Sequence, residues 1–313
     1  MVAQVEGPNK GMELTAYSVR SYLAPAFGSS SCLAFGSVFD ARGTRNEHCC
    51  VDCFNKEGTA VPYVTNQNVR IHYQIEGELG PPLVLQHGFS NSLETWYYAG
   101  YVQALQHDYQ LILIDARGHG ASDKPHDPEA YVLQSRAGDI VAVLDHLHIT
   151  HAYFFGYSMG GWIGFGLAQY APERFHALII GGSHPYARSM DPQRQILRKA
   201  LEQGKEAFVA GVEEQYGPMT PRRKAQALAN DLEALLAMAQ DRSSLEAVLP
   251  TMTMPCLFFA GEADPVYPAV RECVKQLPNV TFFSLPDLSH AEAMTRSDLV
   301  LPHITKFLVT VSH

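Results

Sequence analysis

The stretch Ala152-Tyr-Phe-Phe-Gly-Tyr-Ser-Met-Gly-Gly-Trp-Ile-Gly-Phe-Gly-Leu167 indicates the fold most directly. It begins with a short apolar, aromatic run typical of a buried strand, turns sharply over residues 156–160, and continues in a pattern compatible with a helix. A G-x-S-x-G motif in this setting holds its serine in a strained conformation, so bulky Cβ atoms are excluded two positions before and after it. Gly156 and Gly160 occupy those positions. We therefore expect Ser158 to project from the turn as a nucleophile, with the Met159 N–H directed to where an oxyanion would form.

Four further motifs accompany this turn, namely His87-Gly88-Phe89, Asp115-Ala-Arg-Gly-His-Gly120, Gly261-Glu-Ala-Asp264 and Ser289-His290. With them the chain resembles the α/β-hydrolase-fold serine enzymes from about Tyr63 to its end. The resemblance implies a mostly parallel central sheet flanked by helices, with a helical cap inserted late in the sheet. Strands that alternate with helices along the sequence also predict a parallel sheet.

The composition of the 313-residue chain is ordinary for a soluble globular protein, with 46% hydrophobic and 18% charged residues. The net charge is −9 and no Lys/Arg stripe occurs, so nucleic acid and anionic membrane surfaces are not expected partners. No run reaches the roughly 18 consecutive apolar residues that a membrane span needs. Four of the six cysteines lie in the first 53 residues, which is no disulfide framework and indicates a reducing, cytoplasmic location. The sequence does not indicate an oligomeric state.

Residues 1–60 differ from the rest, because they are rich in Gly, Ser and Ala and lack sustained periodicity. We interpret them as a poorly ordered extension that resembles translated leader sequence upstream of a mobile gene cassette. Residues 21–39 could instead be a secretion signal, although Pro25 and the serines at 29–31 interrupt the apolar run. The cluster His48-Cys-Cys-Val-Asp-Cys53 could bind zinc, but no second pair of ligands follows at finger-like spacing.

The remaining sequence divides into a hydrolase core, residues 61–185 and 255–313, and a cap, residues 186–254. Apolar runs predict strands at 69–75, 83–86, 109–114, 152–156, 178–181, 256–260 and 281–285, and helices at 131–147, after the serine turn to about residue 170, and at 299–309. No good strand occurs between Pro185 and Pro255. Helices fit at 191–204, 205–217 and 221–240, with Asp191-Pro192 and Thr220-Pro221 as N-cap and N1 pairs. A plain crossover would need one helix and far fewer residues, so we predict a cap.

A serine hydroxyl needs a base within hydrogen-bond reach, and the base needs an acid to orient it. In this fold the chain order is nucleophile, acid, histidine. Asp264, in the loop after the strand at 256–260, is the predicted acid; Glu262 is nearer the strand, and Asp287 is too close to the histidine. Among fourteen histidines, His290 follows the last strand by a short loop and is the predicted base. Serine stands before it, at position 289, where the family usually has glycine.

An oxyanion hole requires two N–H donors, which we assign to Met159 and, from the resemblance, to Phe89. His87 is expected to order that loop through hydrogen bonds. Asp115, Arg117 and His119 are interpreted as structural, with substrate contact by His119 as the alternative. Candidates for the substrate pocket, each of which could instead be core packing or structural, are His87, Trp96, Trp162, Met190, Phe208 and Tyr216.

A serine at position 158 argues against haloalkane dehalogenases and epoxide hydrolases of this fold, which attack with aspartate. No metal cluster, P-loop or dinucleotide-binding glycine signature occurs in the predicted enzyme region, so we expect no cofactor. We predict a serine carboxylic-ester hydrolase: His290 deprotonates Ser158, an acyl-enzyme forms, and water releases the acid. The same triad also serves carbon–carbon bond hydrolases and perhydrolases, and the fold serves some non-hydrolytic small-molecule binding proteins.

The chain is also similar to mobile-cassette esterases and to serine-type macrolide esterases, which open the lactone ring of large antibiotics. This similarity implies a macrolactone substrate, and a general small-ester or lactone carboxylesterase is the alternative. Flexible methionines suit a large apolar ligand, although core packing explains them equally well. The methionine and aromatic side chains in and around the predicted cap are Met190, Phe208, Tyr216, Met219, Met238, Met252 and Met254.

Overall fold

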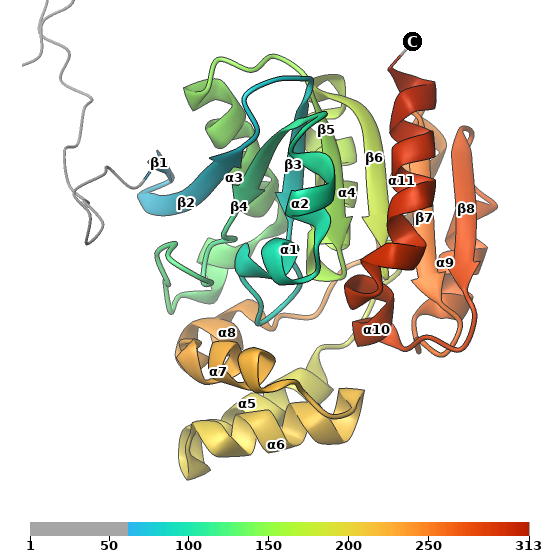
Figure 1. Ribbon diagram of the computed structural model, residues 1–313. Helices are drawn as coiled ribbons and strands as arrows, with labels where there is room; N and C mark the ends of the chain where they lie inside the picture. Colours follow the sequence, from blue (N-terminus) through green and yellow to red (C-terminus); the bar gives the residue numbers. More distant parts are fainter. Residues whose placement is uncertain (1–61, 313) are drawn as a thin grey trace, which may run out of the picture. The chain divides into compact units, whose positions relative to one another are not determined.

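The structure, a computed structural model, describes residues 62–312, so the extension, signal and zinc interpretations of residues 1–60 fall outside the described residues. Its centre is an eight-stranded sheet of order β1-β2-β4-β3-β5-β6-β7-β8 (Figure 1). β1 and β2, and β2 and β4, pair antiparallel, and every other neighbouring pair is parallel. The strands are β1 Tyr63–Asn66, β2 Val69–Glu76, β3 Pro82–Gln86, β4 Gln110–Ile114, β5 Ala152–Tyr157, β6 Phe175–Gly181, β7 Cys256–Gly261 and β8 Val280–Leu285. The predicted α/β-hydrolase architecture is therefore confirmed.

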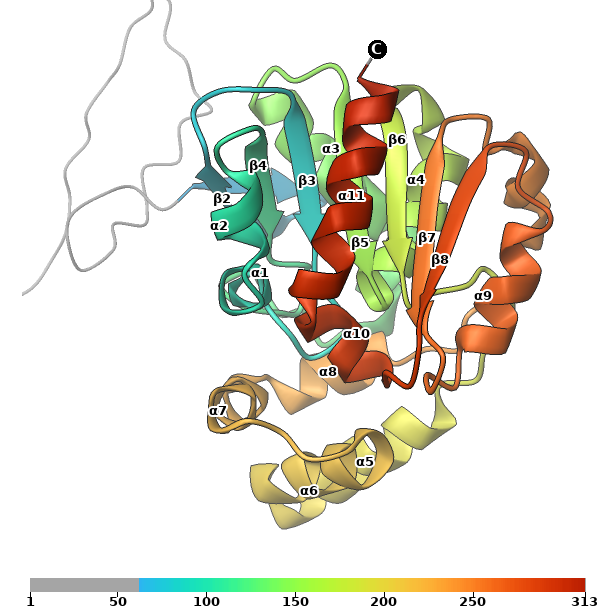
Figure 2. The same cartoon turned by 45° about the vertical axis from the view of Figure 1, so that its right-hand side comes forward.

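Helices cover both faces of the sheet (Figure 2). One face packs on α3 Leu133–His146, α4 Met159–Tyr170 and α9 Tyr267–Val274. The other packs on α1 Glu94–Tyr98, α2 Tyr101–Leu105, α10 His290–Thr295 and α11 Ser297–Val311. Residues 62–312 also contain three short 3₁₀ helices, η1 Pro128–Tyr131, η2 Pro172–Arg174 and η3 Glu246–Thr251.

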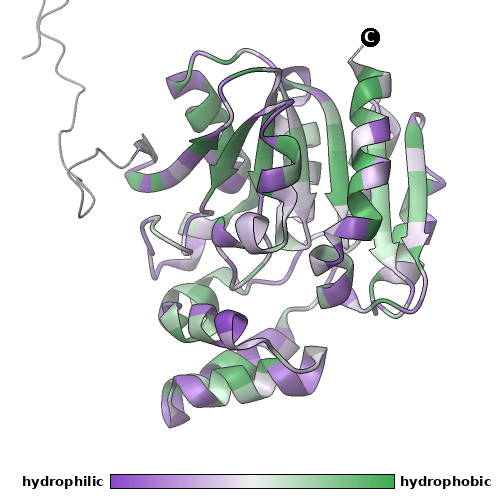
Figure 3. Ribbon diagram, viewed as in Figure 1, coloured by the Kyte–Doolittle hydropathy of each residue, from purple (hydrophilic) through white to green (hydrophobic). Residues whose placement is uncertain are grey.

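The central strands β3, β4, β5 and β7 are mostly apolar because both of their faces are buried. In β3, Leu83 and Leu85 point to the α11 side while Val84 points to the α4 side, and all three are fully buried. β5 alternates in the same way, with Phe154 on the α4 side and Phe155 on the α11 side. These runs are the hydrophobic strands in the centre of Figure 3.

The prediction missed β1. Gln67 and Asn68 connect it to β2, and both have positive φ angles, 51° and 62°. Two successive residues with positive φ form the tight hairpin turn that matches the twist of antiparallel strands. Because β1 has only four residues, its period-two pattern was too short to recognise.

The segment between β6 and β7 contains four α-helices, not the three predicted. They are α5 Asp191–Gln203, α6 Lys205–Tyr216, α7 Pro221–Ala229 and α8 Leu232–Met238. The single helix expected at 221–240 is interrupted because Asn230 is extended, at φ −63° and ψ 151°, and the Asp231 side chain caps α8 by accepting from the Ala234 N–H at 3.0 Å.

The two predicted helix starts had different outcomes. Thr220 caps α7 as expected, accepting from the Arg223 N–H at 3.3 Å, with Pro221 in the first turn. At α5 the prediction was off by one residue, because Met190 is the N-cap and Asp191 is already helical.

The four helices α5–α8 lie together beyond the carboxyl ends of the parallel strands (Figures 1 and 2). They enclose buried apolar side chains of their own, including Leu197, Phe208 and Leu235. At their base, Arg188 and Arg242 form an antiparallel backbone bridge with N–H···O distances of 3.0 and 2.9 Å. We refer to α5–α8 as the cap.

Among residues 62–312, no helix combines the length and apolar character that crossing a bilayer requires.

Candidate active site

Ser158 lies in the sharp turn between β5 and α4, with φ 56° and ψ −111°. The glycines two positions before and after it have no room for a side chain. A Cβ at Gly156 would lie 2.4 Å from the Gly160 carbonyl oxygen, and one at Gly160 would lie 2.1 Å from the Gln86 carbonyl oxygen. The Ser158 N–H donates to the Gly181 carbonyl at the end of β6, at 2.8 Å. The turn is therefore fixed by the adjoining strands.

Three side chains from separate loops meet at this turn. The Nε2 atom of His290 lies 2.9 Å from Ser158 Oγ, and its Nδ1 atom lies 2.5 Å from Asp264 Oδ2. Asp264 is 3% exposed and its other oxygen accepts from the Val266 N–H at 3.0 Å. An ionised Asp264 accepts a hydrogen bond from Nδ1–H, which leaves the Nε2 lone pair directed at the serine hydroxyl. The structure thus brings together all three residues predicted for the triad.

His290 is positioned by two contacts that the sequence analysis did not identify. Ser289 is the N-cap of α10 and forms a capping box with Glu292, whose carboxylate accepts from the Ser289 N–H at 2.9 Å. The Tyr157 hydroxyl donates to the His290 carbonyl at 2.6 Å. The Ser-x-x-Glu spacing at 289–292 was a usable signal, and it explains why serine can stand where the family usually has glycine.

The predicted oxyanion donors come from the loop after β3, which contains Phe89, and from Met159, the residue after the nucleophile. Gly88, in the loop after β3, is so close that a Cβ added there would lie 3.4 Å from Ser158 Cβ. The next residue is Phe89. Within residues 62–312, neither the Phe89 N–H nor the Met159 N–H donates to another protein group. β3 and β5 are neighbours from which the chain departs in opposite directions, and in open α/β sheets ligands bind at such a switch point.

Buried histidines hold the loop after β3, residues 87–93, which we call the oxyanion loop. His87 bonds through Nδ1 to the Gly88 carbonyl at 2.8 Å and accepts from the Ala116 N–H at 3.1 Å. His119 accepts from the Ser90 N–H at 3.0 Å. Burial lowers the pKa of both imidazoles, that of His119 well below 6.5, so each is neutral and can accept. His87 therefore hydrogen-bonds within the loop and the adjoining backbone, and as a fully buried side chain it does not line the pocket beside Ser158.

Asp115 and Arg117 complete this support. Asp115 accepts from His72 Nδ1 and the Leu93 N–H, each at 2.8 Å. Burial alone would raise the pKa of Asp115, but these hydrogen bonds hold it below its ordinary value. Arg117 donates to both carboxylate oxygens of Asp139, at 2.7 and 2.6 Å, and the pair is almost completely buried. Their contacts are structural, as the sequence suggested.

A narrow pocket opens beside Ser158, and the sequence analysis did not identify its other residues. Its lining includes Ser158, Ser183, His184, Tyr186, Arg188, Arg242 and Val266. Burial, followed by the positive charges of Arg188 and Arg242, lowers the pKa of His184 to about 4. Most of these residues follow β6 or lie at the two ends of the cap. Their position beyond the carboxyl end of a parallel strand was the only available signal.

The structure corrects the prediction for Trp96. This indole is fully buried on the α11 side of the sheet, where it packs on Tyr101 and Phe155 with ring centroids 5.4 and 4.7 Å away. Trp162 also lies in the core, 8% exposed. The Arg242 guanidinium lies over its ring at 4.6 Å and itself lines the pocket, so Trp162 is one layer beneath the pocket surface.

The cap candidates pack inside the cap. Met190 and Phe208 are only 4% and 2% exposed and belong to the hydrophobic core. Neither is among the residues that line the pocket beside Ser158. Tyr216 is the last residue of α6, and its side chain is outside what the structure describes.

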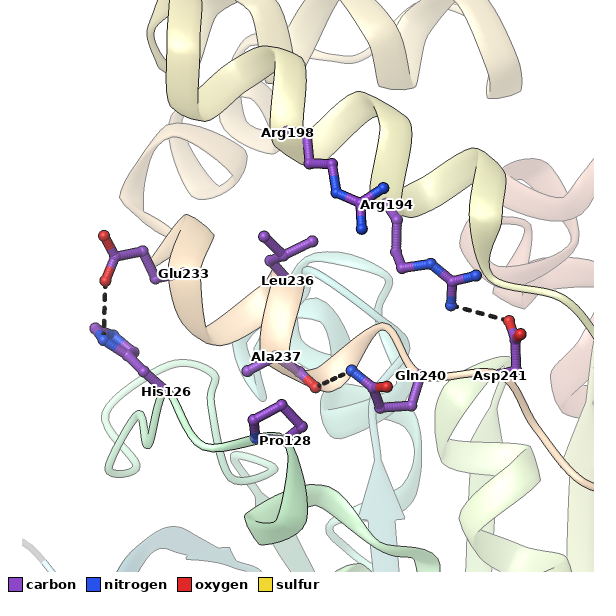
Figure 4. A pocket seen from close by; sticks show the side chains of 9 residues that line it. All are labelled: His126, Pro128, Arg194, Arg198, Glu233, Leu236, Ala237, Gln240 and Asp241. Atoms are coloured by element: carbon purple, nitrogen blue, oxygen red, sulfur yellow. Dashed lines mark hydrogen bonds and ion pairs between the residues drawn. The ribbon is translucent and has the colours of Figure 1, made fainter.

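A second, larger cavity of about 730 Å³ lies between α5, α8 and residues 126–128 (Figure 4). His126 pairs there with Asp231 and Glu233 at 3.0 and 2.9 Å, and Arg194 pairs with Asp241 at 2.9 Å. None of the predicted catalytic residues lines it. In the described part of the chain, no group of three or more His, Cys, Asp or Glu side chains could hold a metal ion.

Comparison with known proteins finds a matching family model and related proteins. The model of the alpha/beta hydrolase fold family matches residues 81–256. The chain is 32% identical to 3-oxoadipate enol-lactonase 2 of Acinetobacter baylyi over 65% of its own length and 79% of that protein. It is 26% identical to a putative 2-succinyl-6-hydroxy-2,4-cyclohexadiene-1-carboxylate synthase of Bacillus subtilis, covering 73% of this chain and 90% of that protein. The crystal structure of an enol-lactonase from Burkholderia xenovorans superimposes with a TM-score of 0.72 at 25% identity, covering 79% of this chain and all of that one.

Proposed function

The chain belongs to the alpha/beta hydrolase fold family, and we propose that it hydrolyses carboxylic esters with Ser158 as nucleophile, His290 as base and Asp264 as orienting acid. It is a hydrolytic enzyme, and its relatives include proteins named as enol-lactonases. The observation that carries the proposed mechanism is the pair of hydrogen bonds that joins Ser158 to His290 and His290 to Asp264.

In the first half-reaction His290 Nε2 accepts the hydroxyl proton while Ser158 Oγ attacks the carbonyl carbon of the ester. The carbonyl oxygen becomes an oxyanion, to which the N–H groups of Phe89 and Met159 donate. His290 then returns the proton to the leaving alkoxide oxygen as the carbon–oxygen bond breaks. The alcohol leaves, and an acyl group stays on Ser158.

In the second half-reaction His290 accepts a proton from water, whose oxygen attacks the acyl carbon. The tetrahedral intermediate collapses, Ser158 Oγ regains its proton from His290, and the acid is released. When the substrate is a lactone, the alcohol and the acid belong to one molecule, so the product is a ring-opened hydroxy acid heavier by one water.

We further propose a lactone as the natural substrate, with the macrolactone ring of macrolide antibiotics as the specific candidate. The resemblance to serine-type macrolide esterases and the enol-lactonase names of two relatives support a cyclic ester. The second candidate is a general small-ester or lactone carboxylesterase, which the narrow pocket beside Ser158 favours. A macrocycle would require the cap to move away from that pocket. The described cysteines, Cys256 and Cys273, are free and buried thiols, which suits the cytoplasmic location that we propose.

The experiment is mass spectrometry of a 16-membered macrolide incubated with the wild type and with Ser158→Ala. We expect the wild type to add one water and the variant to lose about 10⁴-fold or more in kcat. No change in the macrolide, together with Ser158-dependent hydrolysis of p-nitrophenyl acetate, would retain the mechanism and replace the macrolactone with the small-ester candidate. Absence of Ser158-dependent hydrolysis of either substrate would contradict the proposed function as a whole.

A further inference from the structure

The cap contacts the oxyanion loop through one face of α7 and its C-cap residue. Arg223 donates through Nη1 to the Ser90 carbonyl at 3.1 Å and through Nη2 to the Ser90 hydroxyl at 2.9 Å. Asn230, at the end of α7, donates to the same carbonyl at 3.1 Å. Gln226 donates to the Ser92 hydroxyl at 2.7 Å. Three cap side chains therefore hold the backbone segment that follows Phe89.

Ser90 needs such support because its own conformation is unfavourable. Its φ angle is 56°, in the left-handed region that a residue with a side chain rarely adopts. Its N–H is fixed from the core by His119, and its carbonyl is fixed from the cap by Arg223 and Asn230. The peptide between Phe89 and Ser90 is thus held from the core, and the peptide after Ser90 is held from the cap.

Arg223 also places a positive charge against the oxyanion loop. The side chain is partly buried, and no carboxylate of residues 62–312 forms an ion pair with it. The positive charge contributes, after burial, to the lowered pKa of His87 at the start of the oxyanion loop. Arg222, the preceding residue, differs in both respects, because it is exposed and pairs with Glu94 at 3.2 Å.

We propose that Arg223 is a positioning residue for the oxyanion hole, which fixes the loop that presents the Phe89 N–H and places an uncompensated positive charge near the developing oxyanion. The inference rests on the proposed function, because an oxyanion forms only if Ser158 attacks an ester. It gives the cap a role in the chemical step in addition to any role in substrate selection.

A preorganised donor and a fixed charge act on the transition state, where negative charge develops, more than on the neutral bound ester. Loss of Arg223 should therefore lower kcat and leave KM nearly unchanged. A residue that only lined the substrate pocket would raise KM instead.

The test compares Arg223→Met with Arg222→Met, the same change one residue earlier on α7. With p-nitrophenyl acetate, we expect kcat of Arg223→Met to fall about 10- to 100-fold, below the loss known for complete removal of an oxyanion donor. Arg222→Met should stay within about twofold of the wild type. Arg223→Lys keeps the charge but not the planar fork, so it should lie between the two.

Thermal unfolding of each variant separates positioning from folding. If Arg223→Met does not fold, Ser90→Ala removes one acceptor of Arg223 without changing the cap and should itself lower kcat several-fold. Equal kcat values for Arg223→Met and Arg222→Met, or a loss confined to KM, would overturn the inference while the proposed function stands. A wild type without Ser158-dependent turnover of any ester would overturn the proposed function, and this inference with it.

Discussion

The oxyanion loop is held from two sides whose chemistry differs. On the core side, the neutral imidazoles of His87 and His119 accept from backbone N–H groups, and the buried side chains of Arg117 and Asp139 pair with each other. On the cap side, the contact is a guanidinium that bonds to a carbonyl and a hydroxyl, with no carboxylate beside it in residues 62–312. The ion pairs of the cap, such as His126–Asp231, each have at least one exposed member.

Because the two sides differ in this way, substitutions on the core side and on the cap side should affect different properties of the protein. A buried, fully paired network costs much to break, because one charge is then left without a partner in a low-dielectric interior. Exposed pairs contribute little. The unpaired charge of Arg223 contributes most when a negative charge appears, which happens during the reaction. We therefore expect core substitutions to lower the free energy of unfolding and the cap arginine to affect the rate.

The largest effect on stability is expected from Asp139→Asn. The change leaves Arg117 buried without a carboxylate, at a cost of about 3–5 kcal/mol in the free energy of unfolding. Asp145→Asn is the matched control, because Asp145 also lies on α3 and pairs with Arg174 while being 62% exposed. Urea unfolding should show a large loss only for Asp139→Asn. Equal losses would mean that burial does not distinguish the two pairs.

An intermediate effect is expected from the pH dependence of His119. Its folded-state pKa lies well below the ordinary 6.5 because of burial, so below pH 6.5 the unfolded chain binds a proton that the folded chain does not. The stability therefore falls as the pH falls, by at most about 1.4 kcal/mol per pH unit for this group. His119→Gln removes the titration, so urea unfolding between pH 8 and pH 5 should show a shallower loss than in the wild type. An unchanged slope would show that His119 is not buried as a neutral group.

The smallest effect is expected at His126, with the opposite sign. Hydrogen bonding to Asp231 raises the pKa of His126, so its contribution is present at pH 6 and is lost as the pH rises through the raised pKa. Because the side chain is 50% exposed, His126→Gln should lower Tm at pH 6 by less than about 2 °C. The difference should vanish at pH 9 and in about 1 M salt. A loss that grows with pH would contradict this assignment.

Much of this arrangement could be predicted because its physical cause is local. The turn at Ser158 excludes side chains at positions 156 and 160, and glycine at both is visible in the sequence. The central strands are visible in the sequence as continuous apolar runs because both of their faces are buried. The order of nucleophile, acid and histidine then selects Asp264 and His290, which lie within hydrogen-bond reach of one another in the structure.

Other features depend on contacts between distant parts of the chain. Arg223 meets Ser90 across 133 positions, and no local pattern distinguishes it from Arg222. Trp96 was misplaced because an aromatic side chain after the oxyanion loop suits a pocket mouth as well as a core, and only the packing on Phe155 decides. The break between α7 and α8 was a local signal that we missed, since Asp231 is a good N-cap within an otherwise helical pattern.

The backbone bridge between Arg188 and Arg242 has a consequence for how such an enzyme can diversify. It joins the two ends of the segment from residue 189 to residue 241, so the chain enters and leaves this segment at one place. The entropy cost of closing such a loop grows only with the logarithm of its length, about 0.6 kcal/mol for each doubling. Whole caps of other lengths can therefore be grafted at this point with little penalty from chain closure. A graft that omits the arginine facing Ser90 would retain the fold and lose catalytic rate.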